Sequence, residues 1–180
     1  LVTLVDKLAT SGGRNYSRYA FCVAFGLLAS AAGDVMLEIE PSVDHELLFL
    51  GGLGSFLTAH WINIFGMWSG GDNFAPVAAA VAYSFAVGFF SLLDSHTPTE
   101  LKIPVAAYAF SIATMAWAAA RRLGSKSSSQ TSQYLGFVGA VLFVISDSIL
   151  GYNKFAVPIP NAKFLVMVTY YSAQCCIALS

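Results

Sequence analysis

YLGFVGAVLFVISDSILGYNKF, residues 134–155, is the stretch that decides the fold of this chain. About 20 mostly apolar residues cover the hydrocarbon core of a bilayer, so this stretch has the length of a membrane-spanning helix. One acid, Asp147, lies near its far end. A carboxylate at the centre of such a helix costs roughly 2.5–3.5 kcal/mol, and acids there usually face a bundle interior or a cavity. Asp147 is therefore a candidate functional residue.

The composition extends the membrane interpretation to the whole chain. Of 180 residues, 57% are hydrophobic and only 11% are charged, whereas soluble domains are nearer a quarter charged. The formal net charge of −1 argues against a broadly basic surface for nucleic acid. We therefore expect a multi-pass integral membrane protein of the endoplasmic reticulum or another cell membrane, whose partners are membrane lipids and not nucleic acid.

Six segments have the length and composition of spanning helices, and short connections carry most of the charge. The six segments are 17–37, 47–68, 74–93, 101–121, 134–152 and 162–180. The sequence thus predicts an all-α, polytopic transmembrane helix bundle, with residues 1–180 as one integral membrane domain. If the helices alternate in direction, six basic residues fall on one side and three on the other, so the first side is expected to be cytosolic. The first side carries Lys7, Arg14, Arg18, Arg121, Arg122 and Lys126, and the second Lys102, Lys154 and Lys163.

A second acid repeats the arrangement of the first. The segment YAFCVAFGLLASAAGDVML, residues 19–37, carries Asp34 near its end. His60 follows Asp34 by 26 residues in the next helix, and Gln174 follows Asp147 by 27. A four-helix unit used twice gives this spacing, so we predict two tandem, parallel four-helix repeats. On this interpretation Asp34 pairs with His60, and Asp147 with Gln174.

These polar residues also have structural interpretations, which the sequence leaves open. Each acid lies within a turn or two of a helix end and can simply reach water. His60 can be a packing residue that forms a hydrogen bond across helices. Neither interpretation accounts for the recurrence of an acid at equivalent positions, which favours a functional site.

Four further residues are predicted to bind substrate. Asn63 lies one turn after His60, and Tyr170 lies four residues before Gln174, on a shared face. Tyrosine is also common at membrane interfaces. Lys154 lies seven residues after Asp147 and can attract a lipid phosphate or extend to the interface. The predicted substrate-binding residues are thus Gln174, Tyr170, Asn63 and Lys154.

The motifs of common enzyme classes are missing from the sequence. It has no GxSxG elbow, Walker loop, HExxH or dinucleotide fingerprint. One histidine and two acids make a poor zinc site, where three or four protein ligands with His or Cys are usual. We therefore expect neither a metal nor a cofactor, and expect acid–base chemistry by Asp34, Asp147 and His60.

Four short motifs occur in order along the chain: GDVMLEI (33–39), FLTAHWINIF (56–65), GAVLFVISDSILGYNKF (139–155) and YYSAQCCI (170–177). Together they resemble the YhhN-like family of membrane proteins, whose members include the animal lysoplasmalogenases. The resemblance implies about eight spans in the family, so residues 1–9 are expected to be the remnant of a preceding span. It places the family's two acids, histidine and glutamine on Asp34, Asp147, His60 and Gln174.

The resemblance also implies an activity, the hydrolysis of the vinyl ether bond of a lysophospholipid, the lysoplasmalogen. Its products are a fatty aldehyde and a glycerophospho-ethanolamine or -choline. Such a reaction needs a neutral acid, a negative charge to stabilise a cation, and a positioned water. We predict Asp147 as the acid and Asp34 as cation stabiliser and base, with His60 and Gln174 positioning the water.

Three other functions fit the same residues. A membrane transporter or lipid-binding protein can use intramembrane acids to relay protons or ions. A hydrolase of another lipid, with or without a metal, is the second alternative, and a purely structural membrane protein is the third. The enzyme interpretation expects the two carboxyl groups to lie within roughly 5–10 Å of each other, as paired catalytic carboxylates do.

Overall fold

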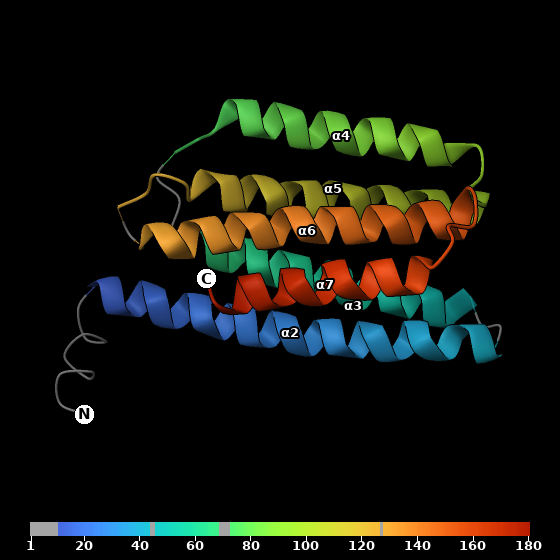
Figure 1. The fold of residues 1–180 in the computed structure, drawn as a ribbon, viewed down its shortest axis with the longest axis horizontal. Coiled ribbons are helices and arrows are strands. Elements are labelled where there is room, and N and C mark those ends of the chain that lie inside the picture. The colour runs from blue at the N-terminus through green and yellow to red at the C-terminus, as the bar shows by residue number, and fades with distance from the viewer. Residues whose placement is uncertain (1–10, 44–45, 69–72, 127) are drawn as a thin grey trace.

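A computed structural model describes residues 11–43, 46–68, 73–126 and 128–180. The described residues form six helices and no strand, so the predicted all-α bundle is confirmed (Figure 1). The prediction that residues 1–9 are the end of a preceding span lies outside the described residues. The helices are α2 (Ser11–Val43), α3 (Glu46–Trp68), α4 (Pro76–Asp94), α5 (Thr99–Arg121), α6 (Gln130–Phe155) and α7 (Ala162–Ala178).

Five of these helices are long and apolar enough to cross a membrane. They are α3, α4, α5, α6 and the Arg18–Glu40 part of α2. The predicted sixth span, 162–180, corresponds to α7, which has 17 residues and is therefore somewhat shorter than the roughly 20 residues of a typical span. The chain is an integral, multi-pass membrane protein.

The helices run side by side and alternate in direction, with α4 on the outside of the bundle (Figure 1). The closest neighbours are α2 with α3 and α6 with α7, while α4 packs mainly on α5. Arg18 lies near the start of α2 and Arg121 ends α5, whereas Lys154 lies in the last turn of α6 and Lys163 in the first turn of α7. The first two of these helix ends lie at one end of the bundle and the other two at the opposite end (Figure 1). These four basic residues therefore separate as the sequence predicts, while the cytosolic side and the two tandem repeats stay predictions.

The core of the bundle centres on Phe143 of α6, which is 1% exposed. Its ring meets those of Phe56, His60 and Tyr170 edge-on, with centroids 4.8–6.4 Å apart. Aromatic rings prefer this geometry because the positive edge of one ring faces the negative face of the other. A single side chain on α6 thus connects α3 with α7.

Small residues let the helices approach closely. Gly51 of α3 packs closely on α2, since a Cβ atom on Gly51 would lie 2.9 Å from the sulfur of Met36. Close backbone approach through glycine is typical of membrane helix pairs. At the opposite end of the bundle, Gln133 closes the α5–α6 connection by accepting from the Gly124 amide at 2.8 Å and donating to the Ser125 carbonyl at 2.6 Å.

Candidate active site

The larger cavity in the bundle has a volume of about 1410 Å³. Its lining includes two aspartates, Asp34 and Asp147, and the tyrosines Tyr108 and Tyr170, while most of the remaining wall is apolar. Small-molecule pockets usually measure roughly 300–1,000 Å³ and place a few polar groups in an apolar lining. The cavity therefore has room for a ligand larger than a typical small molecule, and both aspartates lie in its wall.

One chain of hydrogen bonds ends on Asp147. The Tyr108 hydroxyl donates to Asp147 Oδ2, and His60 Nε2 lies 3.0 Å from the Tyr108 oxygen and 3.8 Å from Asp147 Oδ2. Because the single hydroxyl proton of Tyr108 points to the carboxylate, its oxygen accepts from an Nε2–H of the imidazole. His60 Nδ1 faces the sulfur of Met115 at 3.3 Å. The imidazole is completely buried and contacts the acid through the tyrosine.

A similar chain ends on Asp34. The Tyr170 hydroxyl donates to Asp34 Oδ2 at 2.9 Å, and Gln174 Nε2 donates to the Tyr170 oxygen at 3.1 Å. The contact between Tyr170 and Gln174 confirms that these two residues share a face of α7. Each acid therefore accepts a hydrogen bond from a tyrosine, and each tyrosine is held by a third side chain behind it.

The partners of the two acids are crossed relative to the sequence prediction. We predicted His60 beside Asp34 and Gln174 beside Asp147, because each pair is adjacent in the chain. The structure instead places His60 against Asp147 and joins Gln174 to Asp34 through Tyr170. The closest helix pairs are still α2 with α3 and α6 with α7, so the reason is the face of the helix on which each side chain lies. His60 faces α5 and α6, where it meets Tyr108 and Phe143, whereas Tyr170 faces Asp34 of α2. Both acids still line one cavity.

The other predicted residues lie in different places. Lys154 lines the cavity at the end where α6 and α7 are connected. His60 and Gln174 are buried behind the tyrosines and are not among the residues that line the cavity. Asn63 is buried against α2, where a Cβ atom on Gly26 would lie 2.7 Å from Asn63 Oδ1. Asn63 is therefore apart from the acids and packs between α2 and α3.

Tyr108 is the site residue that the sequence analysis missed. It lies in IPVAAYAFS of α5, a helix without any of the four family motifs. A usable signal was the hydroxyl itself, because a tyrosine in an apolar spanning segment usually finds a hydrogen-bond partner. The sequence could not show that this partner is an acid 39 residues further along the chain.

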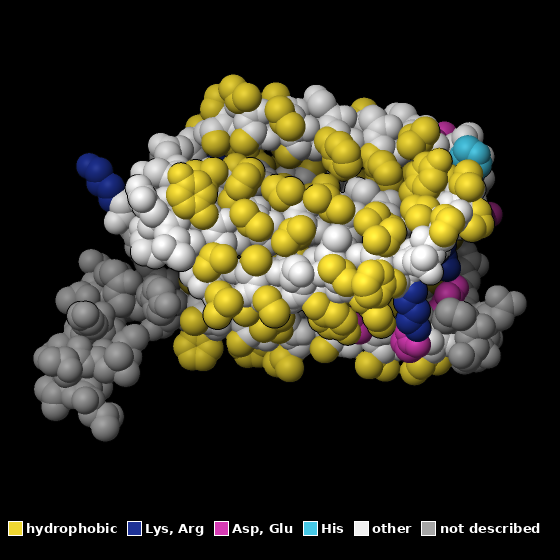
Figure 2. Space-filling model, in the orientation of Figure 1, with side chains coloured by type: hydrophobic (Ala, Val, Ile, Leu, Met, Phe, Trp, Pro, Cys, Tyr) yellow, Lys and Arg dark blue, Asp and Glu magenta, His cyan; other side chains and the backbone are white. Residues whose placement is uncertain are grey.

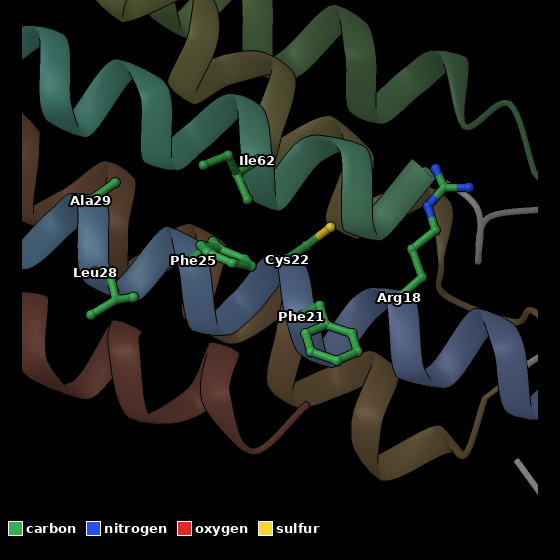
Figure 3. A pocket seen from close by; sticks show the side chains of 7 residues that line it. All are labelled: Arg18, Phe21, Cys22, Phe25, Leu28, Ala29 and Ile62. Atoms are coloured by element: carbon green, nitrogen blue, oxygen red, sulfur yellow. The ribbon is translucent and has the colours of Figure 1, made fainter.

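A second, shallower pocket of about 840 Å³ lies on the surface of α2 and α3. Figure 3 shows its lining, which consists of α2 side chains and Ile62 of α3. Arg18 closes one end, with its guanidinium carbon 4.0 Å from the Phe65 ring centroid. None of the seven residues that line this pocket carries a carboxylate, whereas both Asp34 and Asp147 line the larger cavity.

The described part of the chain holds no group of three or more His, Cys, Asp or Glu residues arranged to bind a metal ion. His60 and Asp147 are close together, but their nearest neighbours are the Tyr108 hydroxyl and the Met115 sulfur. In the described residues, the groups around Asp147 are thus joined by hydrogen bonds.

Comparison with known proteins identifies relatives along most of the chain. The profile described as the YhhN family matches residues 2–180. Lysoplasmalogenase TMEM86B of Sus scrofa is 34% identical over 100% of this chain and 70% of its own length. The Homo sapiens proteins named lysoplasmalogenase TMEM86B and TMEM86A are each 32% identical, over 96% and 86% of this chain and 66% and 62% of their own lengths. The chain thus spans about two thirds of these relatives, and no solved structure matches it.

Proposed function

Because this chain belongs to the YhhN family, we propose that it hydrolyses the vinyl ether bond of a lysoplasmalogen. The substrate class comes from the relatives named lysoplasmalogenase. The observation that supports the proposal most is the pair of acids, Asp34 and Asp147, that line one large apolar cavity within a membrane protein. A single-chain lipid can enter such a cavity from the bilayer.

The proposed reaction needs only two carboxyl groups and one water molecule to account for every proton and bond. An acid donates a proton to the outer carbon of the vinyl ether double bond, which leaves an oxocarbenium ion at the carbon attached to oxygen. Water adds to that carbon and loses one proton to a carboxylate, which gives a hemiacetal. The hemiacetal breaks its bond to the glycerol oxygen, and the hydroxyl proton passes to that oxygen. The products are a fatty aldehyde and a glycerophospho-ethanolamine or -choline.

The two acids have different tasks in this sequence of steps. Asp147 is assigned the general acid, which alternates between a protonated and an ionised form. Asp34 is assigned the carboxylate that stabilises the oxocarbenium ion and takes the proton from water. This proton then passes from Asp34 to Asp147, which restores both groups for the next turnover. Two carboxyl groups in one apolar cavity tend to share a single proton, since like charges disfavour joint ionisation.

The side chains behind the tyrosines hold both acids in place. The imidazole of His60 contacts the Tyr108 hydroxyl, which donates to Asp147. The amide of Gln174 donates to the Tyr170 oxygen, and the Tyr170 hydroxyl donates to Asp34. His60 and Gln174 are therefore proposed as positioning residues that act through Tyr108 and Tyr170.

The proposal is tested with the purified protein in detergent and a lysoplasmalogen as substrate. Release of fatty aldehyde, measured by mass spectrometry, is the expected result, and a chelator should leave the rate unchanged. Loss of activity on addition of chelator would indicate a metal-assisted hydrolase instead. Absence of aldehyde, together with uptake of a lipid or an ion by vesicles containing the protein, would favour a transporter.

Tyr108→Phe is expected to lower kcat by about 10–100-fold and to leave KM nearly unchanged. The substitution removes one hydrogen bond to a carboxylate, which contributes about 1.5–3 kcal/mol, and each 1.36 kcal/mol corresponds to a tenfold change in rate. Steady-state kinetics of aldehyde release measure the effect.

Tyr83→Phe is the matched control for Tyr108→Phe. Tyr83 donates to or accepts from Thr114 at 3.0 Å and does not line the cavity. It should retain the kcat of the unmodified protein. Equal rates in both variants would show that the Tyr108 hydroxyl does not act on Asp147 during the reaction.

A further inference from the structure

Two lysines and two glutamates meet where the cavity reaches the end of the bundle near the α6–α7 connection. Lys154 Nζ lies 3.0 Å from Glu40 Oε1, and Lys163 Nζ lies 2.8 Å from Glu38 Oε1. Glu38, Lys154 and Lys163 line the cavity. Figure 2 shows basic and acidic side chains next to each other at this end of the molecule. We call these four residues the charge cluster.

The ion pairs of the charge cluster are open to exchange with a ligand. The side chains of Lys163 and Glu38 are 68% and 67% exposed, and those of Lys154 and Glu40 are 32% and 21% exposed. An exposed ion pair such as Lys163–Glu38 contributes little to stability, so its replacement by contacts to a ligand costs little. Lys154 also makes a cation–π contact with Phe49, because its Nζ lies 4.3 Å from the centroid of the Phe49 ring. The charges are thus held in place and remain reachable.

We propose that the charge cluster binds the zwitterionic head group of a lysophospholipid. The phosphate binds Lys154 and Lys163, and the ammonium of ethanolamine or choline binds Glu38 and Glu40. The proposal rests on the proposed function for the reaction that follows binding. It adds the part of the substrate that is recognised and the four residues that recognise it.

The spacing along two helices supports this position for the head group. Glu38 lies four residues after Asp34 on α2, which is about 6 Å along the helix axis. Lys154 lies seven residues after Asp147 on α6, about 10 Å along the axis. In a lysoplasmalogen only the three-carbon glycerol unit separates the phosphate ester from the vinyl ether oxygen. A head group at the charge cluster therefore places the vinyl ether beside the two acids.

The hydrocarbon chain of the lipid would lie along the apolar side of the cavity that α4 forms. Every fourth residue of α4 lines the cavity, including Val81, Phe85 and Phe89. This face follows the cavity away from the charge cluster toward the other end of the bundle, where α4 begins (Figure 1). A hydrocarbon chain fits along it, because burying apolar surface is favourable for both the chain and the helix face.

The test measures binding of three saturated ether lipids that cannot be hydrolysed. The probes are 1-O-alkyl-glycerophosphoethanolamine, 1-O-alkyl-glycerol-3-phosphate and 1-O-alkylglycerol, each titrated into the full chain in nanodiscs. The double variant Glu38→Gln/Glu40→Gln is expected to weaken binding of the first probe by about tenfold and to leave or improve binding of the second. Lys154→Gln/Lys163→Gln should weaken both phosphate-bearing probes and leave alkylglycerol unchanged.

The third ion pair at the same end of the bundle provides the control. Lys102 Nζ lies 2.9 Å from Asp94 Oδ1, and neither residue lines the cavity. Lys102→Gln/Asp94→Asn should bind all three probes like the unmodified chain. Equal weakening of all three probes by a charge-cluster variant would show a structural role and overturn the proposal. Competition by free glycerophosphoethanolamine as strong as by the lipid would show a soluble ligand instead.

The binding test is independent of hydrolysis. A head-group preference that the charge-cluster variants abolish, in a protein that releases no aldehyde, would support the charge cluster and refute the proposed function. Aldehyde release at equal efficiency from substrates with and without the head group would refute the charge cluster alone.

Discussion

Replacing Asp34 or Asp147 by asparagine is expected to lower aldehyde release by at least about 100-fold, since positioned acids and bases contribute roughly 10²–10⁴-fold. Asparagine has nearly the same shape as aspartate and still accepts the tyrosine hydrogen bond through its carbonyl oxygen. It can neither donate the proton to carbon nor stabilise the cation with a full charge. The rate is measured with purified variants at saturating lysoplasmalogen.

Two comparisons separate this catalytic effect from a folding effect. Gel filtration and circular dichroism of Asp34→Asn and Asp147→Asn in detergent should match the unmodified chain. Asp94→Asn removes an acid that is paired with Lys102 at the surface and should keep full activity. Retained activity in both Asp34→Asn and Asp147→Asn would rule out the two-acid mechanism.

Gly139→Ala is expected to destabilise the protein by about 1–3 kcal/mol, the usual cost of an overpacked core. A Cβ atom at this position would lie 2.8 Å from Ile177 Cγ1, 2.9 Å from the Ala173 carbonyl oxygen and 3.0 Å from the Ile177 amide nitrogen. Two of these three atoms belong to the backbone of α7, which cannot turn away as a side chain can. The methyl group therefore separates α6 from α7, and thermal unfolding in detergent should begin at a lower temperature.

The same helix offers a matched control for this change. A Cβ atom on Gly151 would meet Leu93 at 3.5 Å and Phe89 at 3.7 Å, which is ordinary van der Waals contact. Gly151→Ala should be neutral or stabilising, since alanine is about 1 kcal/mol more favourable than glycine within a helix. An unchanged melting temperature for Gly139→Ala would mean that α6 and α7 are not packed through this glycine. Because α7 carries Tyr170, activity of Gly139→Ala should fall together with stability.

The sequence was sufficient for the fold class and the position of the spanning helices. Each span is a property of consecutive residues, because an apolar run of about 20 residues must cover the hydrocarbon core whatever its neighbours are. Asp34 and Asp147 could be recognised for the same reason, since an acid within such a run is costly wherever the helix lies. Gln174 and His60 followed from their spacing to these acids, and the family from four short motifs.

Only the tertiary structure decided which of these residues meet. In the structure His60 lies near Asp147 and not beside Asp34, and Tyr108 lies between His60 and Asp147. Asn63 packs against Gly26 of α2. Hydropathy and spacing are read along one helix at a time, whereas contacts depend on how each helix is rotated and which helix lies beside it. Rotation and neighbours are set by how small and aromatic residues pack across the bundle. Gly139 of α6 packs against α7, and Phe143 of α6 packs between α3 and α7. The sequence thus determined the two acids, and the packing determined the hydrogen-bonded chains that distinguish Asp147 from Asp34.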